Sequence, residues 1–148
     1  MQTQRATIQL AGHSLQRVDF DPATFQPEDL LWLPHYARLS DCARKRQTEH
    51  LAGRIAAVYA LREVGEKEVP AVGDRRQPLW PAPWYGSISH CERSALAVVS
   101  AGPVGVDIER ILSPTLATEL ESSIVNNAEK SLLDASGLPS ALALTLAF

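Results

Sequence analysis

The feature that most limits the possible folds is one helical pattern between residues 43 and 63. Apolar side chains recur there at intervals of three and four, which places them along one side of a helix. They are Leu51, Ile55, Val58 and Leu61. Gly65 follows where a helix commonly ends, because glycine accepts the left-handed backbone conformation. The sequence therefore predicts one long two-sided helix that buries its apolar side against other elements.

Strand-like segments surround this helix. Residues 6–10 and 14–20 predict an opening hairpin that turns at Ala11-Gly12-His13. Residues 87–90, 95–100 and 104–109 predict further strands, the last two pairing through the turn Ala101-Gly102-Pro103. Residues 21–34 and 70–83 are punctuated by prolines and predict loops. We therefore expect an α+β fold.

The remaining third of the chain predicts helices. Ser113-Pro114 suits a helix start, with serine as the cap and proline in the first position, and Asn126-Asn127 suits another. Residues 140–148 are apolar and predict a third helix. Glu129 is interpreted as an ordinary acid in a first helical turn, where the helix dipole favours it.

Composition excludes several classes of protein. The 148 residues carry a net charge of −3, whereas a general nucleic-acid binder needs a basic excess. Cys42 and Cys91 stand outside any zinc-ligand pattern or disulfide framework, which favours a reducing compartment. Residues 1–9 do not resemble a signal peptide, and no stretch approaches the roughly 20 apolar residues of a membrane helix. We expect a cytoplasmic protein. Docking onto a membrane-linked assembly stays open as an alternative.

Two carboxylates are predicted to point together. In a strand over residues 104–109, Asp107 and Glu109 share one face, while Val106 and Ile108 face a core. Like charges this close repel unless a cation lies between them, and carboxylate oxygens suit magnesium with a substrate phosphate. An isolated pair of this kind is more often a solvated strand edge, so the magnesium interpretation needs support from other residues.

Phosphate-binding chemistry provides that support. Arg46, His50 and Arg54 follow one another at intervals of four, on one broad side of the predicted helix. Arginine recognises phosphate oxygens with two parallel hydrogen bonds. For the two arginines a solvated helix face is an equal alternative, and for His90 the equal alternative is a hydrogen-bonded structural histidine.

The order of the motifs resembles the 4'-phosphopantetheinyl transferase superfamily, most closely its enterobactin-synthase type from siderophore pathways. The motifs are Arg46-Gln47-Thr48-Glu49 with Arg54, then Arg76-Gln77-Pro78, Ser87-Ile88-Ser89-His90 and Gly105-Val106-Asp107-Ile108-Glu109. The resemblance implies magnesium-dependent transfer of the 4'-phosphopantetheine group from coenzyme A to a serine of an acyl, aryl or peptidyl carrier protein of a siderophore synthase. It also implies a monomer.

The resemblance assigns residues to roles. It implies a metal site of Asp107, Glu109 and the Ile108 carbonyl, and a catalytic group of Asp107, Glu109 and His90. Coenzyme binding is implied in four places: Arg46 and Arg54 at the 3'-phosphate, Ser89 and His90 at other phosphate oxygens, Arg75, Arg76, Gln77 and Pro78 along the adenine, and Asp107 at the pyrophosphate. Arg76-Gln77-Pro78 departs from the Gly-Lys-Pro of many relatives.

The family fold consists of two similar α/β halves with the coenzyme between them. The resemblance implies that residues 1–148 are a partial transferase domain. Residues 1–103 would form the first half, and residues 104–148 the metal-site strand and the start of the second. The family's later W/F-S-x-K-E motif, with a further metal carboxylate and a lysine, would begin at Phe148. We therefore expect a chain truncated before that motif.

Three other functions are compatible with these residues. A truncated chain that keeps the arginines could bind coenzyme A without transferring anything. Two carboxylates and several arginines would also serve a magnesium-dependent hydrolase of nucleotide pyrophosphates. A plain interaction domain is the third alternative, and it predicts no dependence on coenzyme at all.

Overall fold

The computed structural model describes residues 1–109 of the 148-residue chain, so the predicted helices after residue 110, and Glu129, lie outside the described residues. Met1–Ile108 form one compact unit, and Glu109–Phe148 belong to a second. Within the described part, no helix is long and apolar enough to cross a membrane. The first unit is an antiparallel sheet covered by one long helix, which agrees with the predicted α+β class.

The sheet has four antiparallel strands in the order β1-β2-β6-β5. Their bounds are β1 Gln2–Leu10, β2 His13–Asp21, β5 Tyr85–Cys91 and β6 Ser94–Ser100. The predicted opening hairpin is confirmed, and it is longer than expected. Ala11 and Gly12 form its two-residue turn with φ of 51° and 78°, the left-handed values that match the twist of paired strands.

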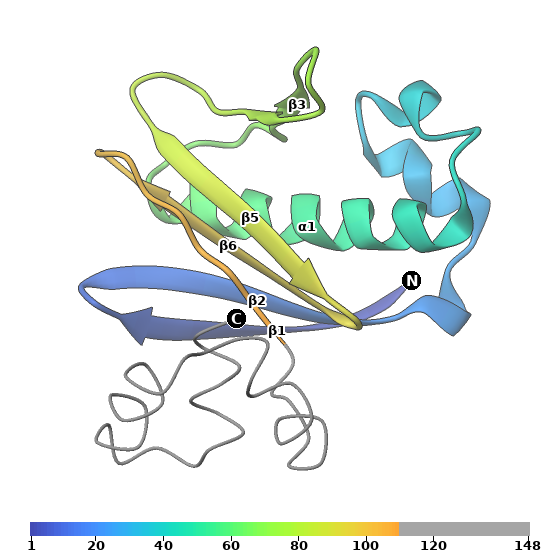
Figure 1. The fold of residues 1–148 in the computed structure, drawn as a ribbon, viewed down its shortest axis with the longest axis horizontal. Helices are drawn as coiled ribbons and strands as arrows, with labels where there is room; N and C mark the ends of the chain where they lie inside the picture. The colour runs from blue at the N-terminus through green and yellow to red at the C-terminus, as the bar shows by residue number, and fades with distance from the viewer. Residues whose placement is uncertain (110–148) are drawn as a thin grey trace, which may run out of the picture. The chain divides into compact units, whose positions relative to one another are not determined.

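Helix α1, Arg44–Glu63, lies across one face of this sheet (Figure 1). The predicted helix is confirmed, and so is its end, because Gly65 adopts a φ of 85° just beyond Val64. The buried surface is wider than the predicted stripe and includes alanines that pack against β2 and β6. These small residues bring the helix close: a Cβ added to Gly53 would lie 2.9 Å from Cγ2 of Ile88 on β5.

The proline-rich segment between β2 and α1 forms three short 3-10 helices instead of an irregular loop. They are η1 Pro22–Thr24, η2 Pro27–Trp32 and η3 Tyr36–Arg38. Their apolar residues form a second core cluster with Leu51 of α1, made of Phe25, Leu30, Leu33 and Leu39. Arg44 closes the segment by donating to the carbonyls of Pro22 and Phe25. This segment therefore packs against the first turns of α1.

The second proline-rich segment contains a small hairpin, β3 Ala71–Val72 with β4 Pro78–Leu79. The Gly73 amide donates to the Gln77 carbonyl at 2.8 Å, and Arg76 turns the chain with a φ of 64°. After β4, the Trp80 ring lies against Gly86 of β5, with no room for a Cβ between them. This contact fixes the hairpin next to the edge strand.

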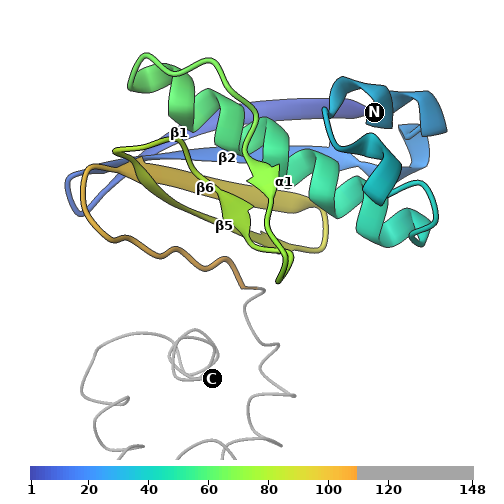
Figure 2. The same ribbon diagram turned by 90° about the horizontal axis from the view of Figure 1, so that it is seen from above.

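The predicted strand over residues 104–109 and its pairing with residues 95–100 are wrong. β6 already has β2 on one side and β5 on the other, so it has no free edge for another partner. The segment instead runs alongside the edge strand β5 (Figure 2). Its apolar residues pack on the face of the sheet opposite α1. The predicted alternation of apolar and acidic side chains is confirmed, because Asp107 is exposed while its apolar neighbours pack against the sheet. Those neighbours are Val104, Val106 and Ile108, and they contact a cluster of Leu15, Leu96 and Val98.

We predict that Gly86→Ala lowers the free energy of unfolding by about 1–3 kcal/mol, the usual cost of overpacking. The added methyl group would meet the Trp80 ring, which packs against the core cluster under α1 and so has little room to move. Urea unfolding measures the change. Gly102→Ala is the matched control, since a Cβ there meets nothing within 4 Å. Equal midpoints for the two variants would contradict the Trp80 contact.

Candidate functional site

A cavity of about 210 Å³ lies where α1, β5 and the β3–β4 hairpin meet. It brings together five residues that the sequence analysis assigned to coenzyme binding. Its full lining is Arg46, Glu49, His50, Gly53, Arg54, Arg76, Pro78, Ile88 and His90. Residues separated by more than forty positions in the sequence therefore share one small space.

Local structure explains why these side chains meet. Arg46, His50 and Arg54 lie one turn apart along α1, which confirms that they share one side of the helix. On β5, Ile88 pairs with Ala97, and His90 pairs with Ala95. Ala95 and Ala97 belong to the core beneath α1, so Ile88 and His90 lie on the same side of the sheet as the helix.

Arg54 is buried, with 4% of its surface exposed, so the solvated alternative is wrong for this residue. Its Nε donates to the Pro70 carbonyl at 2.9 Å, and its Nη2 donates to the Ala71 carbonyl at 3.3 Å. Burial lowers the pKa of Arg54 to about 10, which leaves the guanidinium charged at neutral pH. Nη1 makes no hydrogen bond within residues 1–109. Arg46, by contrast, is exposed at the cavity edge.

The cavity has a positive charge balance. Arg46, Arg54 and Arg76 line it with one acid, Glu49. The Glu49 carboxylate lies 3.5 Å from Nδ1 of His90 and 4.0 Å from Nζ of Lys45. Glu49 belongs to the motif Arg46-Gln47-Thr48-Glu49 but had no predicted role. Its position four residues after Lys45 is the spacing of a helical ion pair. Three guanidinium groups around one carboxylate favour an anionic ligand.

A pair of histidines stands beside this cavity. Nε2 of His50, which lines the cavity, is 2.8 Å from Nε2 of His35, and the two rings meet edge to face. Burial and the nearby charges of Arg54, His35, Arg46 and His90 lower the pKa of His50 to about 3. Burial, Arg54 and Arg38 lower the pKa of His35 as well. No sequence pattern predicts this contact, because His35 and His50 belong to different elements.

The opposite face of β5 holds the other predicted residues. Ser89 donates its hydroxyl to Oδ1 of Asp107 at 2.9 Å and accepts a hydrogen bond from the Ile108 amide at 3.1 Å. The Ser87 hydroxyl accepts from the Val106 amide at 3.2 Å. Two serine side chains thus supply the hydrogen bonds that a neighbouring strand would otherwise provide, and they hold Asp107 against the sheet.

The predicted site is therefore divided between the two faces of β5. His90 lies on the α1 side, while Ser89 and Asp107 lie on the other. Arg75 and Gln77 form the hairpin turn, where the Gln77 side chain accepts from the Arg75 amide at 2.8 Å, and neither residue lines the cavity. Glu109 is exposed and is the last described residue. Since β5 is an edge strand, both faces open at the same border of the sheet.

The oxygen donors after β6 fit a magnesium ion. Asp107 is exposed and uses only Oδ1 in a hydrogen bond, so Oδ2 is available. Within residues 1–109, no group of three or more histidine, cysteine, aspartate or glutamate side chains could hold a metal. Magnesium commonly takes one or two carboxylates and completes its shell with water and substrate phosphate, so a small donor set suits it.

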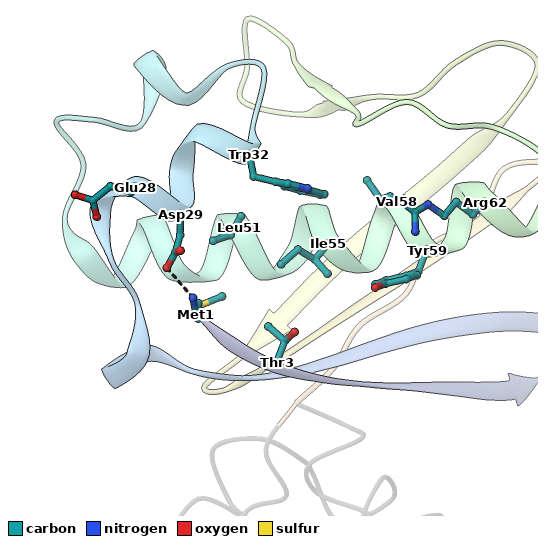
Figure 3. Close-up of a pocket in the computed structure, with 10 residues that line it drawn as sticks. All are labelled: Met1, Thr3, Glu28, Asp29, Trp32, Leu51, Ile55, Val58, Tyr59 and Arg62. Carbon is teal, nitrogen blue, oxygen red and sulfur yellow. Dashed lines mark hydrogen bonds and ion pairs between the residues drawn. The ribbon is translucent and has the colours of Figure 1, made fainter.

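Two larger cavities have a different character. One, of about 460 Å³, has an apolar floor from α1, and its Asp29 carboxylate is paired with the Met1 ammonium at 2.7 Å (Figure 3). The other, of about 630 Å³, lies over the ends of β1 and β2. Each has a single arginine, Arg62 or Arg93, whereas the smaller cavity has three. The smaller cavity is therefore the better phosphate site.

Comparison with known proteins shows what the chain is similar to. Residues 35–100 match the family model of the 4'-phosphopantetheinyl transferase N-terminal domain. Enterobactin synthase component D of Shigella flexneri is 62% identical over 148 residues, which is the whole chain and 72% of the relative. The protein of that name in Salmonella typhi is 59% identical over the whole chain and 63% of the relative. The 4'-phosphopantetheinyl transferase PptT of Mycobacterium tuberculosis is 35% identical over 89 residues, 56% of this chain and 39% of that protein.

The matched region contains the whole lining of the cavity, from Arg46 to His90. The identity to component D extends over the Asp107 segment as well, because it covers every residue of the chain. The chain belongs to the 4'-phosphopantetheinyl transferase family of enzymes.

The hydrogen bonds that Ser87 and Ser89 accept from the Val106 and Ile108 amides predict opposite effects of two substitutions on amide hydrogen exchange. Ser89→Ala should reduce protection of the Ile108 amide about 3- to 10-fold, the equivalent of one ordinary hydrogen bond, and leave the Val106 amide protected. Ser87→Ala should do the reverse. Amide exchange followed by NMR measures both sites in each variant. If either substitution exposes both amides equally, the segment is not held by separate serine contacts.

Proposed function

We propose that this protein transfers the 4'-phosphopantetheine group of coenzyme A to a serine of a carrier protein, in the synthesis of a siderophore. The serine oxygen forms a bond to the phosphorus next to the pantetheine arm. The bond from that phosphorus to adenosine 3',5'-bisphosphate breaks, and the serine proton passes to a base. The identity of more than half to component D of an enterobactin synthase supports the siderophore pathway and a partner with aryl or peptidyl carrier domains.

The observation that carries this proposal is the convergence of Arg46, Arg54, Arg76 and His90 on one small cavity beside α1. Coenzyme A is unusual among acyl carriers in its 3'-phosphate, which needs a compact cationic site. Arg46 is exposed at the edge, where its guanidinium can reach a phosphate, while buried Arg54 holds the hairpin that carries Arg76. Pro78 offers an apolar surface to the adenine next to these charges.

The carboxylates on the other face of β5 are proposed to hold magnesium. Asp107 and Glu109 would bind the ion with the Ile108 carbonyl, and the pyrophosphate of the coenzyme would add further oxygens. The bound ion would neutralise charge that develops on the phosphate oxygens, which is the main requirement of phosphoryl transfer. The Ser89 hydroxyl fixes the orientation of Asp107, and the Ser87 hydroxyl fixes the segment that leads to it.

Because both faces of β5 open at one border, a single extended ligand could contact His90 and Asp107 together. The adenosine end would lie on the α1 side and the pyrophosphate would pass over the strand. We also propose that residues 1–103 form the first of two similar halves, as the resemblance to the family implies.

Intact-mass spectrometry of an apo carrier protein tests the function. We expect incubation with the protein, coenzyme A and magnesium to add one phosphopantetheine to the carrier, and chelation of the metal to stop the reaction. Asp107→Asn should slow transfer roughly 100-fold or more, because it removes charge from the metal site but keeps the Ser89 contact. Transfer that survives both chelation and this substitution would contradict the metal site.

Arg46→Ala tests the proposed 3'-phosphate site. We expect it to weaken binding of coenzyme A about tenfold, the usual cost of one charge-assisted hydrogen bond, and to change binding of 3'-dephospho-coenzyme A much less. Isothermal titration calorimetry measures both ligands. Lys45→Ala is the matched control, because the neighbouring Lys45 side chain is 85% exposed and does not line the cavity. Equal losses for the two ligands would place Arg46 elsewhere on the coenzyme.

Binding without transfer is the second candidate. It requires only the cationic cavity of Arg46, Arg54 and Arg76 and no metal-binding group. The two measurements separate the candidates: coenzyme binding that depends on Arg46, with no mass added to any carrier, would identify a binding protein. Release of nucleotide products without a carrier would identify a pyrophosphate hydrolase instead.

A further inference from the structure

The histidine pair next to the cavity carries an inference about how this site holds an anion. Its short Nε2–Nε2 contact of 2.8 Å is a hydrogen bond, so one ring donates a proton and the other accepts. Four arginines surround the pair: Arg46 and Arg54 on α1, Arg38 on η3, and Arg76 across the cavity. His90 and one acid, Glu49, complete these surroundings. In this field neither ring gains a second proton at neutral pH.

Two tautomer arrangements are possible, and the surroundings of His35 distinguish them. Nδ1 of His35 is buried and has no hydrogen-bond partner. If His50 were the donor, this atom would carry a proton, and a donor would be left buried and unpaired. If His35 is the donor, the same atom is an unprotonated acceptor. Orphaned buried N–H groups are rarer than under-satisfied acceptors, and nearby Arg38 and Arg54 favour a lone pair over an N–H dipole.

We propose that His35 is a positioning residue: it donates from Nε2 to Nε2 of His50 and thereby fixes His50 as the tautomer protonated on Nδ1, a neutral N–H donor for a phosphate group in the cavity. The hydrogen bond of the His50 ring to His35 uses Nε2, and Nδ1 of His50 makes none within residues 1–109. Since His50 lines the cavity, its Nδ1 proton is available to a ligand. The inference rests on the proposed function for the identity of that ligand. It adds a neutral donor to the three guanidinium groups and His90 that line the same cavity.

A neutral donor has a specific advantage at this position. A protonated His50 would add a fourth positive charge next to Arg46 and Arg54, and burial makes that charge costly, which is why the pKa of His50 is about 3. A fixed N–H contributes a hydrogen bond without this cost. The contribution of the His50 N–H to phosphate binding should therefore be insensitive to pH over the range in which an exposed histidine would lose its charge.

The tautomers can be measured in the free protein. Two-dimensional NMR of the 15N-labelled imidazole rings of the full chain at pH 7.5 should show His50 protonated on Nδ1 and His35 protonated on Nε2. His35→Gln keeps an amide donor and should preserve the His50 tautomer. His35→Phe keeps a ring but removes the donor, and should release it. A His50 protonated on Nε2 in the wild type would overturn the inference without any ligand being added.

The second test measures binding of adenosine 3',5'-bisphosphate. Adenosine 5'-monophosphate is the comparison ligand, because it lacks the 3'-phosphate. His35→Phe should weaken bisphosphate binding about fivefold, His35→Gln should stay within about twofold, and the monophosphate should change little. The ratio of the wild-type and His35→Phe affinities should be constant from pH 7.5 to 9. A ratio that falls to one as the pH rises would overturn the neutral donor.

Two controls keep the outcomes separate. His13→Phe makes the same replacement in the β1–β2 hairpin, and it should alter neither binding nor the His50 tautomer. Thermal unfolding of each variant shows whether the fold is retained. If the wild type binds no bisphosphate, the proposed function fails and the ligand part of the inference fails with it, whereas the tautomers decide the role of His35 by themselves. Unchanged bisphosphate binding in a folded His35→Phe variant would overturn that role in the site.

Discussion

The close packing of α1 on the sheet is the constraint on which the other features depend. Alanines at positions 52, 56, 57 and 60 face alanines and larger apolar residues of β2 and β6, and Gly53 lies against Ile88. Small side chains permit this approach because a larger one would have to displace backbone or a β-branched neighbour. The cavity exists at one end of this contact, where the packed surface gives way to Arg46, His50 and His90.

A buried cation then connects the helix to the next segment. Arg54 is charged, nearly inaccessible to solvent, and bonded to the carbonyls of Pro70 and Ala71. These contacts compensate part of the cost of burying the guanidinium. They also place the β3–β4 hairpin, which Trp80 fixes from its other end against Gly86. Arg76 and Pro78 reach the cavity because both anchors act on a hairpin of only two-residue strands.

Side chains that alternate along the edge strand β5 divide the candidate site residues between the two faces of the sheet. Successive residues of a strand point to opposite faces, so Ser87 and Ser89 serve the Asp107 segment while Ile88 and His90 serve the cavity. In a central strand these two groups would be separated by neighbouring strands. At the border of the sheet they are separated only by the thickness of one backbone, which suits a ligand with phosphate groups at two positions.

The sequence by itself determined the local elements and the kinds of residue in the site. Periodicity predicted α1 and its end at Gly65, and a glycine turn predicted the first hairpin. The alternation of Val106, Asp107 and Ile108 predicted which side chains pack against the sheet. Each of these features follows from a pattern within one short segment of the sequence. The resemblance of the motifs predicted the family, which the comparisons confirmed.

Only the tertiary structure decided how these parts are combined. β6 took β2 and β5 as partners, so residues 104–109 could not pair with it, and two serines hold that segment instead. Arg54 became buried, and His35 met His50, through contacts between separate elements. Strand order and the burial of a charge depend on which distant segments pack next to each other. A periodic pattern within one segment does not specify those long-range partners.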